Sequence, residues 1–332
     1  MQPLVSVVID NYNYGRFLAQ AIESVFAQTY PHWELIVVDD GSTDNSREIL
    51  AAYAGRVVPL LQSNSGQGAA ITAGIRRSRG EIVCLLDADD YYHPQKLEKV
   101  VAAFAAHPSW VQIAHGRIVV DGNNHRIGVG PRRYSQGDVR NLLLRWGRYG
   151  FGITSSLAYR REVLWQALPI PSRRAAAADT YLGAIIPFYG EVGCINEPLM
   201  FYRIHGNNKQ ARNDNLDYLI QEREDTAAFI NQGAARTGLS ARFDVNQDLE
   251  YRCLKAMERT QGSGLGALNL AWLSLRESLA LGRTPPDTLE KILRRSLCVL
   301  SPEAGREVLR LGLRGYVRAK SPRRWQPQGD NF

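Results

Sequence analysis

The sequence lacks several features that mark particular classes of protein. No apolar run approaches the ~20 residues that a membrane-spanning helix needs. The N-terminal stretch MQPLVSVVID has no basic region, and its apolar run is too short for a signal peptide. The four cysteines are far apart and show no CxxC spacing, so we expect buried or free thiols in a reducing compartment. These absences favour a soluble cytoplasmic protein.

Two glycine-rich motifs for binding phosphate are also missing. A dinucleotide-binding domain would have GxGxxG after its first strand, where this chain reads DNYNYG, and the P-loop sequence GxxxxGK(S/T) does not occur. A metal ion is then the better candidate for anchoring a phosphate group.

Acidic residues are scarce near the C-terminus. The net charge is +7, and the last 32 residues carry +4 of it, with seven Lys or Arg against three Asp or Glu. Arginines recur there at every fourth position beside an apolar stripe, namely Arg306, Arg310, Arg314 and Arg318. Such a basic amphipathic helix can lie at the inner face of an anionic membrane, and a surface helix packed on its own domain is the alternative. The remaining helices of this region could form a homodimer contact. We expect no nucleic-acid partner.

The first hundred residues alternate between strand and helix periodicity. Buried strands are predicted at 4–9, 33–40, 57–62 and 81–87, with helices between and after them at 17–28, 42–54, 68–78 and 94–108. This order predicts an α/β fold with a mostly parallel sheet and helices on both faces.

The pattern loosens after residue 108. A β-hairpin is predicted to turn at residues 121–123, followed by strand-like segments at 152–164 and 191–206. From about residue 214 the chain is nearly all helical. We therefore expect an α/β domain over 1–212 and a mainly α-helical region over 213–332.

The stretch CLLDADDYYHP (84–94) places Asp87, Asp89 and Asp90 directly after a buried strand. Two other predicted strands end in polar residues, DNYN at 10–13 and DDGS at 39–42. Ligands of an open parallel sheet bind beyond the C-terminal ends of its strands. A bound Mg²⁺ or Mn²⁺ would offset the repulsion among carboxylates at this edge. Such an ion usually completes its coordination shell with phosphate oxygens of the substrate. Asp90 could instead be a turn residue.

Several segments together resemble a known family. VSVVIxxYN, ELIVVDDGSTD, the glycine-containing segment NSGQGA (64–69) and LLDADDYYHPQKL are similar, in this order, to motifs of the family 2 inverting glycosyltransferases. The resemblance covers roughly residues 4 to 205 and implies a GT-A fold. It also implies a nucleotide-sugar donor and a divalent cation, Mn²⁺ or Mg²⁺.

The resemblance assigns roles to the N-terminal motifs. Asp87-Ala88-Asp89 would be the DxD motif, with Asp89 as metal ligand and Asp87 near the ribose of the nucleotide. Asp10 and Tyr12 fall where the family contacts the base, and Asp40 would accept an N–H group of the base. The family commonly has Pro-Thr where this chain has Asp10-Asn11.

Further roles follow downstream. Asp179, with Leu182 three residues later, corresponds to the general base that the family places at the start of a helix; a plain N-cap is the alternative. Ser155 and Ser156 would line the donor sugar or acceptor. In YRIH (202–205), Arg203 would neutralise a phosphate and His205 would reach the metal or the diphosphate.

The expected function is therefore inverting transfer of a sugar, from a UDP- or dTDP-sugar, to an acceptor hydroxyl. Synthesis of a bacterial polysaccharide, glycolipid or other glycoconjugate is the expected setting. One alternative is a catalytically degenerate relative that binds nucleotide without turnover. A second is a receiver-type Mg²⁺-binding signalling module, which would leave DADD and YRIH unexplained.

Overall fold

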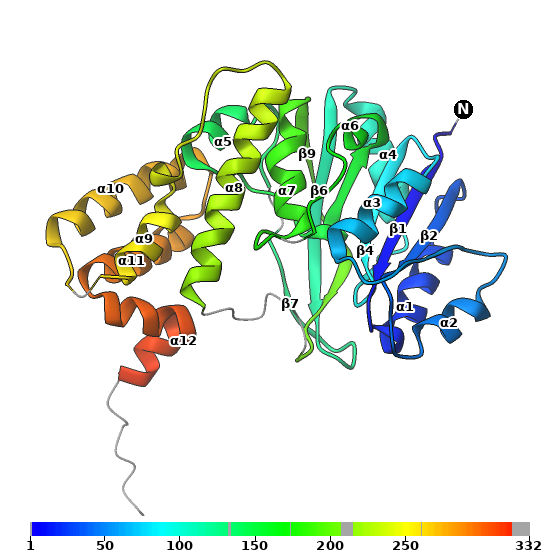
Figure 1. The fold of residues 1–332 in the computed structure, drawn as a ribbon, viewed down its shortest axis with the longest axis horizontal. Coiled ribbons are helices and arrows are strands. Elements are labelled where there is room, and N and C mark those ends of the chain that lie inside the picture. The colour runs from blue at the N-terminus through cyan, green and yellow to red at the C-terminus, as the bar shows by residue number, and fades with distance from the viewer. Residues whose placement is uncertain (1, 132–133, 173, 207–214, 260, 321–332) are drawn as a thin grey trace, which may run out of the picture. The chain divides into compact units, whose positions relative to one another are not determined.

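Two structural units make up the chain, as the ribbon drawing of the computed structural model shows (Figure 1). The structure describes residues 2–131, 134–172, 174–206, 215–259 and 261–320. The first unit comprises residues 1–209 and 221–247, and the second comprises 210–220 and 248–332. The predicted boundary between residues 212 and 213 lies outside the described residues.

The described strands of the first unit form one nine-stranded sheet in the order β3-β2-β1-β4-β8-β6-β9-β5, with β7 paired to β6. Strands β1 to β4 pair in parallel, as predicted, and β6 pairs in parallel with β9. Strand β8 runs antiparallel to both β4 and β6 and so joins the two parallel sets. The strands are Val5–Asn11 (β1), Trp33–Asp39 (β2), Val58–Leu61 (β3), Ile82–Asp87 (β4), Tyr91–Tyr92 (β5), Trp110–Val120 (β6), Arg126–Val129 (β7), Leu157–Arg160 (β8) and Glu191–Arg203 (β9).

Helices cover both faces of this sheet, which confirms the predicted fold class. Val7 and Ile9 of β1 point to one face and Val8 points to the other, because side chains alternate along a strand. The first face packs against α1 (Gly15–Phe26), α2 (Ser46–Ala52) and α4 (Lys96–Ala106). The second packs against α3 (Gln67–Arg77), α5 (Arg140–Trp146), α6 (Arg161–Gln166), α7 (Ala178–Ile185) and the part of α8 (Leu216–Arg236) that belongs to this unit.

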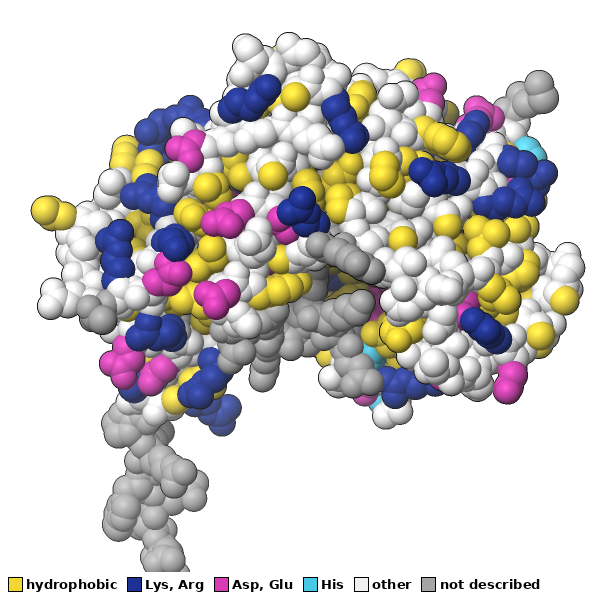
Figure 2. All heavy atoms as spheres, in the orientation of Figure 1, with side chains coloured by type: hydrophobic (Ala, Val, Ile, Leu, Met, Phe, Trp, Pro, Cys, Tyr) yellow, Lys and Arg dark blue, Asp and Glu magenta, His cyan; other side chains and the backbone are white. Residues whose placement is uncertain are grey.

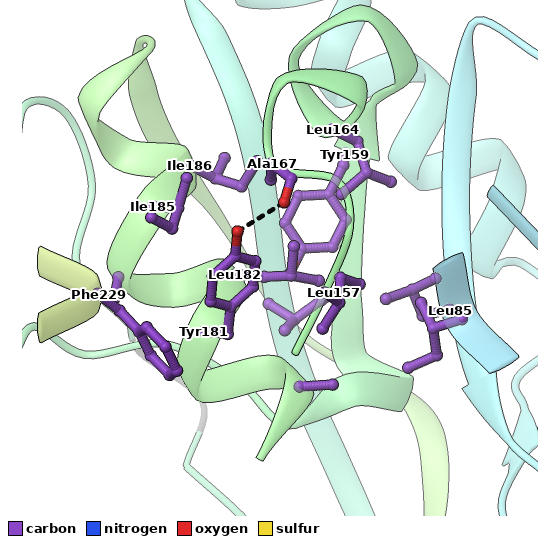
Figure 3. Close-up of a cluster of buried hydrophobic side chains, with 14 of the residues drawn as sticks. Leu85, Leu157, Tyr159, Leu164, Ala167, Tyr181, Leu182, Ile185, Ile186 and Phe229 are labelled. Carbon is purple, nitrogen blue, oxygen red and sulfur yellow. Dashed lines mark hydrogen bonds between the residues drawn. The ribbon is translucent and has the colours of Figure 1, made fainter. Parts of the chain in front are cut away.

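Helix α7 is held firmly in the second core (Figure 3). The Tyr181 hydroxyl donates a hydrogen bond of 2.6 Å to the carbonyl oxygen of Ala167. Its ring meets the ring of Phe229 edge-on, with the ring centres 4.9 Å apart. These contacts fix the start of α7, where the predicted catalytic acid lies.

One predicted segment differs from the structure. Residues 152–164 were expected to be strand-like, but they contain a 3-10 turn at Thr154–Ser156, the short strand β8 and the beginning of α6. The predicted hairpin is present as β6 and β7, with Asn124 in the left-handed region at φ 69°.

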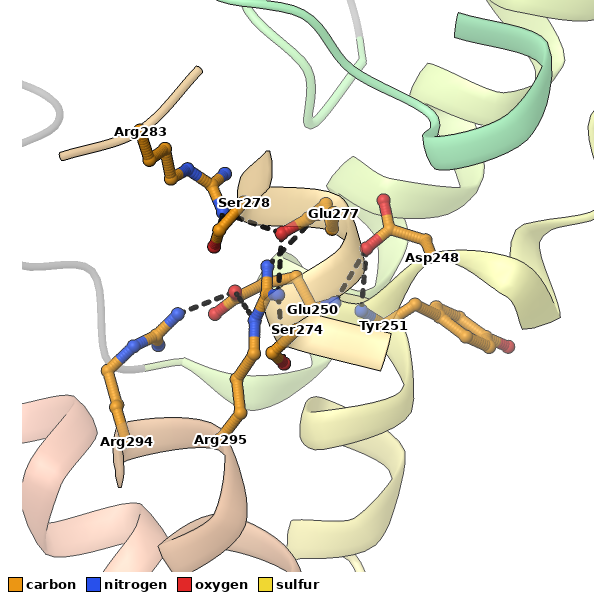
Figure 4. Close-up of polar contacts among 9 residues, drawn as sticks. All are labelled: Asp248, Glu250, Tyr251, Ser274, Glu277, Ser278, Arg283, Arg294 and Arg295. Carbon is orange, nitrogen blue, oxygen red and sulfur yellow. Dashed lines mark hydrogen bonds and ion pairs between the residues drawn. The ribbon is translucent and has the colours of Figure 1, made fainter. Parts of the chain in front are cut away.

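The second unit is helical, as predicted, and contains α9 (Leu249–Met257), α10 (Gly264–Ala280), α11 (Pro285–Leu300) and α12 (Pro302–Lys320). A buried polar network links these helices (Figure 4). The Glu277 carboxylate accepts hydrogen bonds of 2.6 Å from both Arg283 and Arg295. Arg295 and Glu277 are both fully buried, so their charges depend on one another.

Helix α12 is interrupted at Gly312, whose φ of 72° and ψ of 161° are not helical. The break divides the predicted arginine row into the exposed pairs Arg306 and Arg310, before it, and Arg314 and Arg318, after it. Figure 2 shows Lys and Arg side chains on the surface over this helix, with acidic side chains among them. Among the described residues, no helix is long and apolar enough to cross a membrane.

Candidate active site

The C-terminal ends of β1, β2 and β4 lie side by side, as the sequence predicted. Asp10 is the register partner of Asp87 on β4, and Asn11 is the register partner of Asp39 on β2. The Asn11 amide donates to Asp39 over 2.9 Å and to Ser42 over 3.1 Å, which ties the two strand ends together. The polar ends of three strands therefore form one surface.

A carboxylate cluster lies at this surface. Asp87, Asp89 and Asp90 each offer one oxygen atom, and these atoms lie within 4.8 Å of one another. Burial raises the pKa of Asp87 and of Asp90 well above the usual value, and neighbouring carboxylates raise both further. Burial, followed by the charge of Asp89, raises the pKa of Asp10 to about 7. Burial and mutual repulsion therefore disfavour the ionised carboxylates here, and a bound cation would favour them.

His205 joins the cluster from the end of β9. Its Nε2 atom lies 3.0 Å from Oδ2 of Asp89, so the structure brings together the two residues predicted to bind metal. The imidazole ring packs against the rings of Tyr14 and Phe17, with ring centres 5.4 and 5.0 Å away. These two rings restrict the orientation of His205.

Arg203 is almost fully buried beneath the cluster. Its backbone N–H donates to Asp90 over 3.0 Å, and Nε donates to the carbonyl oxygen of Asp89 over 2.8 Å. The other two guanidinium nitrogens donate to Asn124 and Gln20, each over 2.8 Å. In this conformation Arg203 positions the carboxylates, and its neutralisation of a phosphate stays a prediction.

The serines predicted to line the sugar or acceptor are fully buried. The Ser155 hydroxyl accepts a hydrogen bond of 3.0 Å from the backbone N–H of Asp87. The Ser156 hydroxyl donates over 2.8 Å to the carbonyl oxygen of Ile153. Their contacts here are with the chain itself, and the lining role stays a prediction.

The predicted base-binding residues differ in their surroundings. Asp40 accepts three hydrogen bonds, from the Gln62 amide and from the backbone N–H groups of Ser65 and Gly66, over 2.7 to 2.9 Å. It thereby fixes the loop in which Gly66 has a φ of 89°. A carboxylate has about four acceptor sites, so one remains for a ligand. Tyr12 is 42% exposed just beyond β1.

Asp179 is the second residue of α7 and is not its N-cap, which is Ala177. One carboxylate oxygen accepts a hydrogen bond of 2.7 Å from the backbone N–H of Thr180. Burial raises the pKa of Asp179, and its charge contributes to the raised pKa of Asp87. The predicted base therefore lies close enough to the cluster to influence it electrostatically.

Sequence reasoning missed Gln67, the first residue of α3. Its side-chain amide donates to Oδ1 of Asp87 over 2.9 Å and also hydrogen-bonds Asp10. The signal was present, because Gln67 lies within the segment NSGQGA that supported the family resemblance. Gln20 and Asn124, which hold Arg203, lie in no recognisable motif.

The comparisons with known proteins agree with this geometry. Residues 6–168 match the family described as Glycosyl transferase family 2. An uncharacterized glycosyltransferase of Nostoc sp. (strain PCC 7120) is 37% identical over 81% of this chain and 88% of its own length. The chain belongs to glycosyltransferase family 2. This membership makes it a transferase and rules out the receiver-type alternative.

Two further proteins are similar to this glycosyltransferase, one in part of its sequence and the other in its fold. A candidate teichuronic acid biosynthesis glycosyltransferase of Bacillus subtilis, TuaG, is 42% identical over 30% of this chain and 40% of its own length. S. aureus TarS 1–349, crystallised with UDP-GlcNAc, superposes with a TM-score of 0.54. At 15% identity, it covers 95% of this chain and 92% of that one. The second likeness confirms the GT-A fold.

The residues at the strand ends suit a divalent cation. The available oxygens are carboxylates, the ligands preferred by Mg²⁺ and Mn²⁺. Oδ2 of Asp90 is buried with no hydrogen-bond partner among the described residues, which is costly unless a ligand or ion compensates. The cluster and the raised pKa values both fit a cation at this position.

Proposed function

We propose that this glycosyltransferase moves a sugar, with inversion, from a UDP- or dTDP-sugar to an acceptor hydroxyl. The main support is the meeting of Asp87, Asp89, Asp90 and His205 at the C-terminal edge of the sheet. Asp89 and His205 would hold Mn²⁺ or Mg²⁺, with Asp87 beside them and near the ribose. The ion would supply Lewis-acid stabilisation of the departing diphosphate.

Asp179 is the proposed general base. A base must take the proton of the acceptor hydroxyl while that oxygen attacks the anomeric carbon. The carboxylate lies at the rigid start of α7, and its raised pKa makes it a better proton acceptor than an exposed aspartate. Ser155 and Ser156 are proposed to line the donor sugar or acceptor, where their hydroxyl groups also hydrogen-bond the surrounding backbone.

Binding of the nucleotide base is assigned to Asp10, Tyr12 and Asp40. The acceptor site left on Asp40 and the exposed ring of Tyr12 are compatible with hydrogen bonding and stacking against a pyrimidine. The relative named for teichuronic acid and the TarS complex with UDP-GlcNAc support a UDP-sugar and a role in bacterial glycoconjugate synthesis.

The helical unit is the proposed site of contact with other molecules. The basic helix α12 is compatible with an anionic membrane surface, and a cytoplasmic enzyme placed there could reach a lipid-linked acceptor. A homodimer through the same helices is the second candidate.

The function is tested by nucleotide release from UDP-, dTDP- and GDP-sugars with Mn²⁺. We expect release with a UDP- or dTDP-sugar and a loss of roughly 100-fold or more in kcat for Asp89→Ala and for Asp179→Asn. Glu303→Gln, on the exposed start of α12, is the matched control. Nucleotide binding without release would favour the degenerate alternative, and unchanged rates in both variants would disprove the assigned site.

A further inference from the structure

A buried lysine lies beneath the carboxylate cluster and has no part in the function proposed above. Lys96 is fully buried at the first position of α4. Its Nζ donates a hydrogen bond of 2.8 Å to the carbonyl oxygen of Ser155 and lies 3.4 Å from the centre of the Tyr92 ring. A fully buried lysine is unexpected, because lysine is almost never fully buried unless it is paired.

The local environment disfavours a cation at this position. The N-terminus of a helix carries partial positive charge, which repels an ammonium group. Burial lowers the pKa of Lys96 to about 7, which reflects the cost of placing its charge in the interior. A methionine would occupy a similar volume without that cost. Burial therefore opposes a lysine here, whereas the hydrogen bond to Ser155, the Tyr92 ring and the charge of Asp90 favour its ammonium group.

The contacts of Lys96 lead directly to the cluster. Ser155, whose carbonyl oxygen accepts from Lys96, uses its hydroxyl to accept the backbone N–H of Asp87. Asp87 is one of the three carboxylates whose oxygens lie within 4.8 Å of one another. A chain of two hydrogen bonds thus joins the ammonium group to the cluster.

We propose that Lys96 is a positioning residue for the cation site, acting through Ser155 to hold Asp87 in its place beside Asp89 and Asp90. This inference rests on the proposed cation site. Partners that orient metal ligands typically change metal affinity by about 10- to 100-fold when they are replaced. Lys96 would orient the ligand Asp87 in this way, through Ser155 and without contacting the ion itself.

Mn²⁺ binding to the full chain, followed by electron paramagnetic resonance without nucleotide, tests the inference. Wild type is expected to bind Mn²⁺ and Asp89→Ala to lose binding; failure of wild type would count against the cation site itself. In Lys96→Met we expect the dissociation constant for Mn²⁺ to rise roughly 10-fold or more. Lys99→Met, on the same helix in a partly exposed ion pair with Glu197, should leave it unchanged.

A double-mutant cycle tests the route through Ser155. If Lys96 acts through this residue, Lys96→Met combined with Ser155→Ala should weaken Mn²⁺ binding no more than the stronger single variant. Thermal unfolding without metal should shift by no more than about 4 °C in Lys96→Met, because a lost hydrogen bond is offset by removal of a buried charge.

Two results would overturn the inference. One is a Mn²⁺ affinity of Lys96→Met within twofold of wild type; if the unfolding temperature also drops strongly, the role of Lys96 is purely structural. The other is full additivity with Ser155→Ala. If Lys96→Met fails to fold, Ser155→Ala decides, because unchanged Mn²⁺ binding there breaks the proposed link.

Discussion

At the residue scale, Asp179 connects burial to the pH dependence of the rate. A general base works only when it is ionised, and burial raises the pKa of Asp179 above its ordinary value. The base is therefore lost as the pH falls through this raised pKa and is present above it.

We accordingly predict that kcat/KM at saturating Mn²⁺ rises with pH along an acid limb that lies above about pH 4, the range of an ordinary aspartate, and then levels off. In Asp179→Asn the rate should fall roughly 10²- to 10⁴-fold. The residual activity should no longer show the increase with pH that the ionisation of Asp179 causes. A pH–rate profile of both proteins measures this. An identical limb with an undiminished rate in Asp179→Asn would show that another group is the base.

Arg203 shows why parts of the site could not be read from the sequence. The resemblance of YRIH to a family motif led to the prediction that Arg203 neutralises a phosphate, and this stays a prediction. Its actual partners include Gln20 and Asn124, which are 183 and 79 positions away in the chain. No local pattern encodes such contacts, because they arise only when β6, β9 and α1 pack together. Asp89 and His205 were predicted to bind metal because each lies in a short motif, and the structure places these two side chains 3.0 Å apart.

At the scale of elements, long apolar runs were predicted well and short mixed segments were not. Strands β1, β2 and β4 are buried on both faces, so their sequences are continuous apolar runs. Residues 152–164 hold three short elements, the first of which contains the fully buried Ser155 and Ser156. Periodicity cannot resolve elements of three to six residues.

Helix α12 provides a prediction at the same scale. If it contacts an anionic surface, reversing Arg314 and Arg318 to Glu should weaken co-sedimentation with phosphatidylserine-containing vesicles by tenfold or more, since each basic residue contributes about 1 kcal/mol there. Both side chains lie beyond the break at Gly312 and are exposed. Neutral vesicles are the control. Equal sedimentation of wild type and variant would exclude this helix as the contact.

At the scale of the whole molecule, both units bury charged groups. The first packs two apolar cores on either side of a sheet and also buries Lys96 and Arg203. The second buries Arg295 and Glu277 as an ion pair. Removing one partner of a buried ion pair leaves the other charge unpaired, which typically costs about 3–5 kcal/mol.

We therefore predict that Glu277→Gln lowers the unfolding free energy of the helical unit by about 3 kcal/mol or more, because Arg295 is fully buried beside it. Chemical denaturation followed by circular dichroism measures the change, with the exposed Glu303→Gln as control. Mn²⁺ binding should be unaffected, since the cation site belongs to the first unit. A loss below about 1 kcal/mol would indicate that Glu250 and the serines compensate.

The four cysteines have a practical consequence. All of them are buried, which keeps alkylating reagents away from the thiols, and burial also raises the pKa of Cys84 to about 11. The native protein should therefore react very slowly with maleimide dyes. Two cysteines introduced at exposed positions, one in each unit, would be labelled selectively, and fluorescence energy transfer between them would measure the distance between the two labels with and without the sugar donor.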